Sequence, residues 1–134
     1  VTMALADAGV EPAAVDYVNA HATSTPVGDR SEVRALRLAL GDEVAARTMV
    51  SSTKSMHGHC LGAAGGVEAA LTALAIREGM VPPTINLDDL DPDCDGVDHV
   101  ANAAREAEVR VAVSSAFGFG GHNAILVMGR TEDG

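Results

Sequence analysis

Two kinds of apolar segment, short runs and longer stretches, take turns along this chain of 134 residues. Short apolar runs, some with strict alternation, predict β-strands. These runs are residues 15–20, 48–52, 109–113 and 124–128. Longer segments rich in apolar residues predict α-helices. These segments are residues 2–8, 29–40 and 61–76. Strands that alternate with helices and then end in a pair of strands predict an α/β fold with a mixed sheet.

The helix predicted at 29–40 has a recognisable start and end. Asp29 and Glu32 have the spacing of a capping box, in which the N-cap side chain and a Glu three residues later bind free amides of the first turn. Gly41 follows the last apolar residue and is suited to end the helix. The sequence therefore predicts that Asp29 is the N-cap.

The segment 61–76 is apolar on nearly every face, and Glu68 is its only ionisable residue. A helix on a protein surface has a polar side, so we expect this helix to be buried all round. A chain of this size rarely buries a whole helix, and we expect the helix to pack against something outside this chain. An unpaired carboxylate would be costly there. Lys54, just after the preceding strand, is the expected partner of Glu68.

Composition and charge argue against several classes of function. The formal net charge is −10 and the isoelectric point is near 4.7, which disfavours binding to nucleic-acid phosphates. No apolar run reaches the length that spans a membrane. Cys60 and Cys94 do not form a disulfide framework, and free thiols indicate the cytoplasm. Because the chain opens with Val inside a predicted helix, we interpret it as part of a longer soluble cytoplasmic protein.

Candidate catalytic residues lie where predicted elements meet. His21 ends the first predicted strand, and the hydroxyls of Thr23 and Thr25 follow at once. His59 precedes the helix at 61–76 by two residues. The partial positive charge of a helix N-terminus favours a neutral imidazole. Two neutral imidazoles can donate N–H groups to an oxyanion, so His21 and His59 are candidates for such a site.

Three other kinds of site are disfavoured. The glycine-rich turn at 118–121 lacks the Gly-Lys-Ser/Thr of a phosphate loop and links two strands. The segment 91–96 matches the start of a calcium-binding loop, but Asn102 stands where a bidentate Glu is needed. His57 and His59 are two residues apart, yet no complete set of zinc ligands accompanies them. We therefore predict no metal ion.

Three separated segments carry a resemblance to a known family. They are residues 19–26 (NAHATSTP), 53–59 (TKSMHGH) and 117–123 (FGFGGHN). Together they resemble the C-terminal half of the β-ketoacyl-[acyl-carrier-protein] synthases, the condensing enzymes of fatty-acid and polyketide synthesis. The resemblance covers nearly all of residues 1–134 and implies one half of a thiolase-like fold around a buried central helix. It also implies that the family's nucleophilic cysteine lies in an N-terminal half absent from this chain.

The resemblance implies catalytic roles for four residues. His21 and His59 would stabilise the enolate that forms when a malonyl thioester loses carbon dioxide. Lys54 would orient the active-site histidine, and Glu68 would pair with Lys54 in a supporting role.

Other residues receive binding or structural roles from the same resemblance. Thr23 and Thr25 would contact the pantetheine arm of the substrate. The backbone N–H of Phe119 would belong to the oxyanion hole, and its ring would gate the acyl pocket. Phe117 is expected in the core. Cys60 matches a non-catalytic family position, and we interpret it as a packing residue.

The activity implied by the resemblance is decarboxylative Claisen condensation of an acyl thioester with malonyl-acyl-carrier-protein in fatty-acid elongation. It needs no cofactor beyond the phosphopantetheine arm of the acyl carrier protein, and the whole enzyme is expected to be a homodimer. A ketosynthase of a polyketide synthase is an alternative with the same motifs. A non-catalytic partner subunit of chain-length-factor type is a further alternative, and the presence of both His21 and His59 argues against it.

Overall fold

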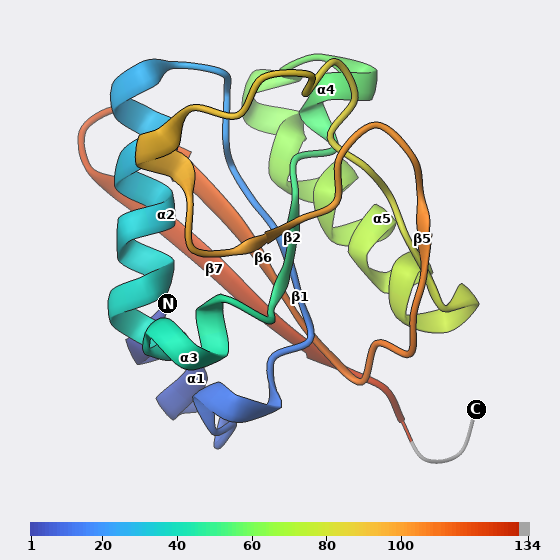
Figure 1. Cartoon of the computed structure of the whole chain (residues 1–134). Coiled ribbons are helices and arrows are strands. Elements are labelled where there is room, and N and C mark those ends of the chain that lie inside the picture. Colours follow the sequence, from blue (N-terminus) through green and yellow to red (C-terminus); the bar gives the residue numbers. More distant parts are fainter. Residues whose placement is uncertain (132–134) are drawn as a thin grey trace.

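The computed structural model describes residues 1–131, which form three layers. Helices α1 (Thr2–Ala8) and α2 (Pro26–Leu40) cover one face of a sheet, and helix α5 (Ala64–Glu78) covers the other (Figure 1). The predicted α/β fold with a mixed sheet is therefore confirmed. None of the helices within residues 1–131 is both long and apolar enough to cross a membrane.

The main sheet has five strands in the order β4-β2-β1-β6-β7, and only β7 runs antiparallel to its neighbour. Its strands are β1 (Tyr17–Asn19), β2 (Met49–Ser51), β4 (Asp98–His99), β6 (Val111–Gly118) and β7 (His122–Gly129). A separate antiparallel ribbon pairs β3 (Met80–Val81) with β5 (Arg105–Glu106). The remaining short helices are η1 (Pro12–Ala14), α3 (Asp42–Ala45), α4 (Lys54–His57), η2 (Leu61–Ala63) and η3 (Pro92–Cys94).

Strand β1 lies at the centre of the sheet, and its side chains alternate between two apolar clusters. Val18 packs with Val33 and Leu36 of α2 on one face. Tyr17 packs with Ile76 of α5 on the other face. All three residues of β1 are buried. Because a central strand is covered on both faces, its C-terminal end is held firmly and can position the residues that follow it.

Helix α2 begins at Pro26, three residues before the predicted N-cap Asp29, so the capping-box prediction is wrong. Proline is favoured at the first helical position, because its missing N–H would be unpaired there and its φ is already helical. Thr25 therefore takes the N-cap position, and Glu32 does not bind an N-cap amide. Gly41 ends the helix as predicted.

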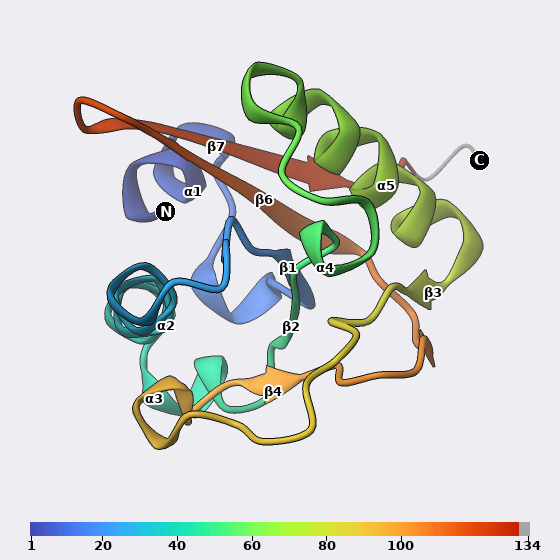
Figure 2. The same ribbon diagram turned by 90° about the horizontal axis from the view of Figure 1, so that it is seen from above.

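Helix α5 corresponds to the predicted helix, but residues 61–63 form the 3-10 helix η2 and the α-helix begins at Ala64. One side packs on the sheet, where Glu68 is fully buried. The opposite side is apolar and exposed, with Val67 36% and Leu74 42% exposed. Figure 2 shows α5 across β6 from α2. No described residue covers this outer side, so the expected packing against something outside this chain stays a prediction.

We expect the isolated chain to self-associate through the outer side of α5, because exposed apolar surface favours association by ~25 cal/mol per Å² removed from water. Replacing Leu74 with Lys should lower light scattering at equal concentration. Leu38→Lys is the matched control, because Leu38 is a 79% exposed leucine on α2. Equal scattering by the unmodified chain and both variants would contradict the expectation.

Candidate functional site

The carboxyl ends of three parallel strands bring the candidate residues together. Strands β2, β1 and β6 are neighbours that run in the same direction. The loops that follow such strands meet at one edge of a sheet. His21 follows β1, Lys54 opens α4 shortly after β2, and Phe117 lies near the end of β6. Segments far apart in the sequence therefore share this edge.

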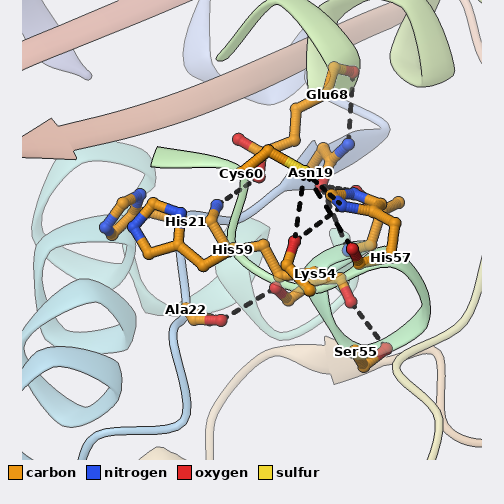
Figure 3. Close-up of polar contacts among 12 residues, drawn as sticks. Asn19, His21, Ala22, Lys54, Ser55, His57, His59, Cys60 and Glu68 are labelled. Atoms are coloured by element: carbon orange, nitrogen blue, oxygen red, sulfur yellow. Dashed lines mark hydrogen bonds and ion pairs between the residues drawn. The ribbon is translucent and has the colours of Figure 1, made fainter. Parts of the chain in front are cut away.

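The imidazoles of His21 and His59 pack edge to face, with ring centroids 5.4 Å apart and planes at 87° (Figure 3). The structure thus brings together the two histidines that the sequence proposed as a pair. The ring of Phe117 is tilted against His21, also at a centroid distance of 5.4 Å. Sequence reasoning expected Phe117 only in the core. Its position at the start of the 117–123 motif gave no indication of this contact.

Burial keeps His21 neutral at pH 7. Burial is the largest cause, and together with the nearby charges of Lys54 and His59 it lowers the pKa of the imidazole from 6.5 to about 4. The Nδ1 atom of His21 is buried and has no hydrogen-bond partner among the described residues. A neutral imidazole at this position can donate one N–H to an anionic oxygen without first losing a charge.

His59 is held by a local hydrogen bond. Its Nδ1 accepts the backbone N–H of Leu61 at 3.2 Å. In the neutral ring the proton must then lie on Nε2. The sequence predicted a helix N-terminus two residues after His59, whereas the 3-10 turn at 61–63 separates His59 from α5. The tautomer is therefore fixed by the Leu61 amide.

Lys54 and Glu68 form a buried ion pair through Nζ and Oε1, which confirms the pairing predicted from the sequence. Their side chains are 4% and 0% exposed. The second carboxylate oxygen of Glu68 has no hydrogen-bond partner among the described residues. The pair connects the start of α4 with α5, and it places the Lys54 charge beside the two histidines (Figure 3).

The buried side chain of Asn19 joins the elements that carry this ion pair. Its Nδ2 donates to the Thr72 hydroxyl at 3.2 Å and to the Glu68 carbonyl at 3.3 Å. Its Oδ1 accepts the Thr53 hydroxyl at 3.3 Å. One side chain at the end of β1 therefore contacts both α5 and the residue before Lys54. Sequence analysis missed this role, although an Asn within a buried strand implies that its amide has specific partners.

The loop after β1 is held by a side chain that binds its backbone amides. The carboxylate of Glu32 accepts the N–H groups of His21 at 2.9 Å and Ala22 at 2.8 Å. Burial raises the pKa of Glu32, and the hydrogen bonds from these amides oppose that rise. The hydroxyl oxygens of Thr23 and Thr25 lie 3.3 Å apart in the same loop. Glu32 thus fixes the direction in which this loop leaves the sheet.

A cavity of about 660 Å³ opens beside this loop. Thr23, Thr25 and His59 line one part of it, and the segment 84–91 lines another. Arg30 of α2 binds Asp91 at 2.8 Å and so holds that segment in place. A cavity of this volume is in the range that small-molecule ligands occupy. The hydroxyls of Thr23 and Thr25 can form hydrogen bonds with a ligand in this cavity.

Phe119 lies at the tip of the β6–β7 hairpin and is 98% exposed. Gly120 and Gly121 follow with φ of 84° and 80°, a backbone conformation that favours glycine. Within the described residues the Phe119 ring is not brought into the cluster of His21 and Phe117.

Cys60 was interpreted as a packing residue, but it is exposed in the described chain. Its Sγ lies 3.9 Å from Nδ1 of His57. The difference arises because Cys60 precedes the 3-10 turn at 61–63, whose residues are exposed, and does not lie on the buried side of α5.

Within residues 1–131, no group of three or more His, Cys, Asp or Glu side chains is placed to hold a metal ion. The site instead combines two imidazoles with a buried lysine–glutamate pair. Such a set can donate N–H groups to an oxygen on which negative charge develops.

Comparisons with known proteins give the family of the chain. A family model described as β-ketoacyl synthase, C-terminal domain, matches residues 1–88. The chain is 53% identical over 126 residues to 3-oxoacyl-[acyl-carrier-protein] synthase 2 of Synechocystis sp., covering 94% of this chain and 30% of that protein. The chain therefore spans about 30% of the length of the curated relatives it matches.

Solved structures give the same result. The ishigamide ketosynthase/chain length factor superposes with a TM-score of 0.90 at 42% identity, over 96% of this chain and 31% of that chain. The structure of a type II PKS acyl-carrier protein in complex with its ketosynthase gives a TM-score of 0.93 at 38% identity. The match covers 97% of this chain and 31% of that chain. These similarities confirm the ketosynthase fold that the sequence predicted.

Replacing either partner of the Lys54–Glu68 pair should leave a buried charge alone and lower the free energy of unfolding by ~3–5 kcal/mol. The variants are Lys54→Ala and Glu68→Ala. The double variant removes both charges and should lose less than the sum of the single losses. Chemical denaturation of all three measures this, and strictly additive losses would show that the two residues do not interact.

The pKa of His21, about 4 against an ordinary 6.5, predicts a pH dependence of stability. The unfolded chain takes up a proton near pH 6.5 that the folded ring does not accept until about pH 4. The contribution of His21 to stability is therefore present above pH 6.5 and is lost as the pH falls toward 4. An NMR titration of the His21 ring, assigned with His21→Gln, should show a midpoint near 4, and a midpoint at 6.5 or above would refute it.

Proposed function

Because the chain belongs to the β-ketoacyl synthase family, whose C-terminal domain it matches, we propose that residues 1–134 are the C-terminal half of a condensing enzyme. This enzyme catalyses decarboxylative Claisen condensation of an acyl thioester with malonyl-acyl-carrier-protein in fatty-acid elongation. The supporting observation is the edge-to-face contact of His21 and His59 at 5.4 Å beside the buried Lys54–Glu68 pair. The name of the relatives, 3-oxoacyl-[acyl-carrier-protein] synthase 2, supports the same reaction.

The two histidines stabilise the enolate in this proposal. When the malonyl carboxylate leaves as carbon dioxide, its bonding electron pair passes through the α-carbon onto the thioester oxygen. His59 donates through Nε2–H, because its Nδ1 already accepts the Leu61 amide. His21 supplies the second donor, and its low pKa supports a neutral ring. Each such donor contributes ~3 kcal/mol in the transition state.

Carbon–carbon bond formation then uses a group outside this chain. The enolate carbon attacks the carbonyl of an acyl group held on the family's nucleophilic cysteine. The new carbon–carbon bond forms as the carbon–sulfur bond breaks and the cysteine leaves as a thiolate. That cysteine belongs to an N-terminal half, which is part of this proposal. Cys60 is not assigned the role.

The Lys54–Glu68 pair sets the geometry and charge of the histidines. Lys54 acts as a positive charge that disfavours the imidazolium form of His21, which agrees with the direction of that pKa. Glu68 holds the ammonium group from α5. In this proposal Lys54 serves catalysis through its effect on the histidines, and Glu68 supports it.

Substrate binding in the proposal uses the cavity and the hairpin. Thr23 and Thr25 contact the pantetheine arm, which fits their position on the cavity wall. The N–H of Phe119 completes an oxyanion hole and its ring gates the acyl pocket once the N-terminal half is present. No cofactor is needed beyond the phosphopantetheine arm. The partners are an acyl carrier protein and a second copy of the enzyme, and the enzyme works in the cytoplasm.

A ketosynthase of a polyketide synthase is the second candidate. It is favoured by the similarity to the type II PKS ketosynthase structure. Products separate the two candidates, because fatty-acid elongation starts from saturated acyl chains and polyketide synthesis extends unreduced β-keto chains. A non-catalytic chain-length-factor-type subunit is disfavoured, because both His21 and His59 are present.

The test uses this chain together with its N-terminal half. His21→Ala and His59→Ala should each lower malonyl decarboxylation by ~10²–10³-fold, because each removes one donor to the developing oxyanion. Acyl loading of the cysteine should persist, because neither ring holds the first thioester. Release of labelled carbon dioxide and mass spectrometry of the acyl-enzyme measure the two steps separately.

Arg110→Ala provides a control, because the exposed Arg110 side chain pairs with Glu108 just before β6, away from the cavity, and has no assigned role in the reaction. It should retain both steps. Decarboxylation above about a tenth of the unmodified rate in both His21→Ala and His59→Ala would overturn the assignment.

A further inference from the structure

The loop that carries Thr23 and Thr25 is attached to the fold almost entirely by side chains. Before it, the Ala20 N–H binds the Ser51 carbonyl at 2.8 Å, and after it the Asp29 N–H binds the Thr25 carbonyl at 3.0 Å. Between these bonds, no backbone-to-backbone hydrogen bond holds residues 21–24 within the described chain. The conformation of this loop must therefore be fixed by other groups.

Ser52 binds the carbonyl side of the loop. Its Oγ donates to the carbonyl oxygen of Ala22 at 2.8 Å, and Ser52 itself is 4% exposed. Glu32 binds the opposite side by accepting the N–H groups of His21 and Ala22. Figure 3 shows the dashed line that leaves the Ala22 carbonyl toward the turn of Lys54. The Ala22 residue is thus held through both of its backbone polar groups.

Ser52 is itself fixed in place by neighbouring hydroxyls. Its backbone N–H donates to the Thr84 hydroxyl at 2.8 Å. Its carbonyl accepts the Ser55 N–H at 3.2 Å and the Ser55 hydroxyl at 2.9 Å. Ser55 also accepts the Ile85 N–H at 2.9 Å, which joins the segment 84–91 to the same turn. A rigid donor is therefore aimed at the Ala22 carbonyl from the turn that opens α4.

We propose that Ser52 is a positioning residue that sets the Thr23–Thr25 loop relative to the Lys54 turn and so determines binding of the pantetheine arm. This inference rests on the proposed function and extends it to a residue with no role assigned above. Loss of the Ser52 hydroxyl leaves the Ala22 carbonyl without its donor. The Thr25 N–H keeps its 3.4 Å bond to the Asp29 carboxylate, so the gain in freedom falls mainly on the Ala22–Thr23 peptide. His21 keeps its own amide bond to Glu32, so the enolate-stabilising ring is affected less than the two threonines.

The experiment measures steady-state kinetics of the enzyme that contains this chain and its N-terminal half, with malonyl-acyl-carrier-protein as the varied substrate. Ser52→Ala should raise KM about tenfold while kcat changes less than about threefold. Ser52→Thr keeps the hydroxyl and should restore KM to within about threefold of the unmodified value. Hydrogen exchange should also become faster at the amides of residues 22–25 in Ser52→Ala and not in Ser52→Thr.

Ser115→Ala is the matched control. Ser115 is a fully buried serine whose hydroxyl has no hydrogen-bond partner in the part of the chain that the structure describes. Its replacement removes the same atoms from the interior without releasing the loop, so KM should not change. If Ser52→Ala does not fold, Thr84→Val removes the hydroxyl that binds the Ser52 amide and should raise KM in the same direction.

The outcomes separate this inference from the proposed function. If the unmodified enzyme does not condense acyl and malonyl thioesters, the proposed function fails. If it does, but Ser52→Ala keeps the original KM and exchange rates, the positioning role fails alone. An equal fall in kcat with unchanged KM, or no rescue by Ser52→Thr in a stably folded protein, would also overturn it.

Discussion

The buried ion pair between Lys54 and Glu68 is the constraint on which the rest of the site depends. Two charges that are 4% and 0% exposed must stay in contact, because separating them would leave each without solvent or a counter-charge. The pair therefore fixes the distance between the turn after β2 and helix α5. Asn19 adds hydrogen bonds from the end of β1 to the same helix, so three elements are joined at one edge of the sheet. The two histidine rings pack against each other at the same edge of the sheet.

A neutral imidazole and an ordered loop lie at this edge of the sheet. Burial and the Lys54 charge both oppose protonation of His21. The same surroundings that bring the two rings together therefore favour the neutral imidazole of His21, which can donate an N–H to an oxyanion. The loop after β1 has left the sheet and has no strand partner for its backbone. Its amides and carbonyl are satisfied by Glu32 and Ser52 instead. Side chains from two different elements thus replace a backbone ladder, which lets the loop border a cavity while its conformation stays defined.

The outer side of α5 and the tip of the β6–β7 hairpin expose large apolar side chains that no described residue covers. Leu74 is 42% exposed and Phe119 is 98% exposed, although both belong to apolar or glycine-rich segments of the kind that usually pack. The curated relatives are about three times longer than the matched region, since this chain covers 30% of one of them. An added half that covers α5 would also change the surroundings of Phe119, and the proposed gating role depends on that contact.

The strand–helix order and the two candidate histidines could be predicted from the sequence. The lysine–glutamate pair could be predicted too, because an isolated carboxylate in an apolar helix requires a counter-charge. The predicted start of α2 was wrong, because both the capping pattern at Asp29 and Pro26 are start signals and local sequence does not say which one prevails. The roles of Asn19, Glu32 and Ser52 in holding the site, and the contact of Phe117 with His21, became visible only in the folded chain. Those contacts join residues on different elements, and their geometry depends on how parallel strands and α5 pack, which no local spacing encodes.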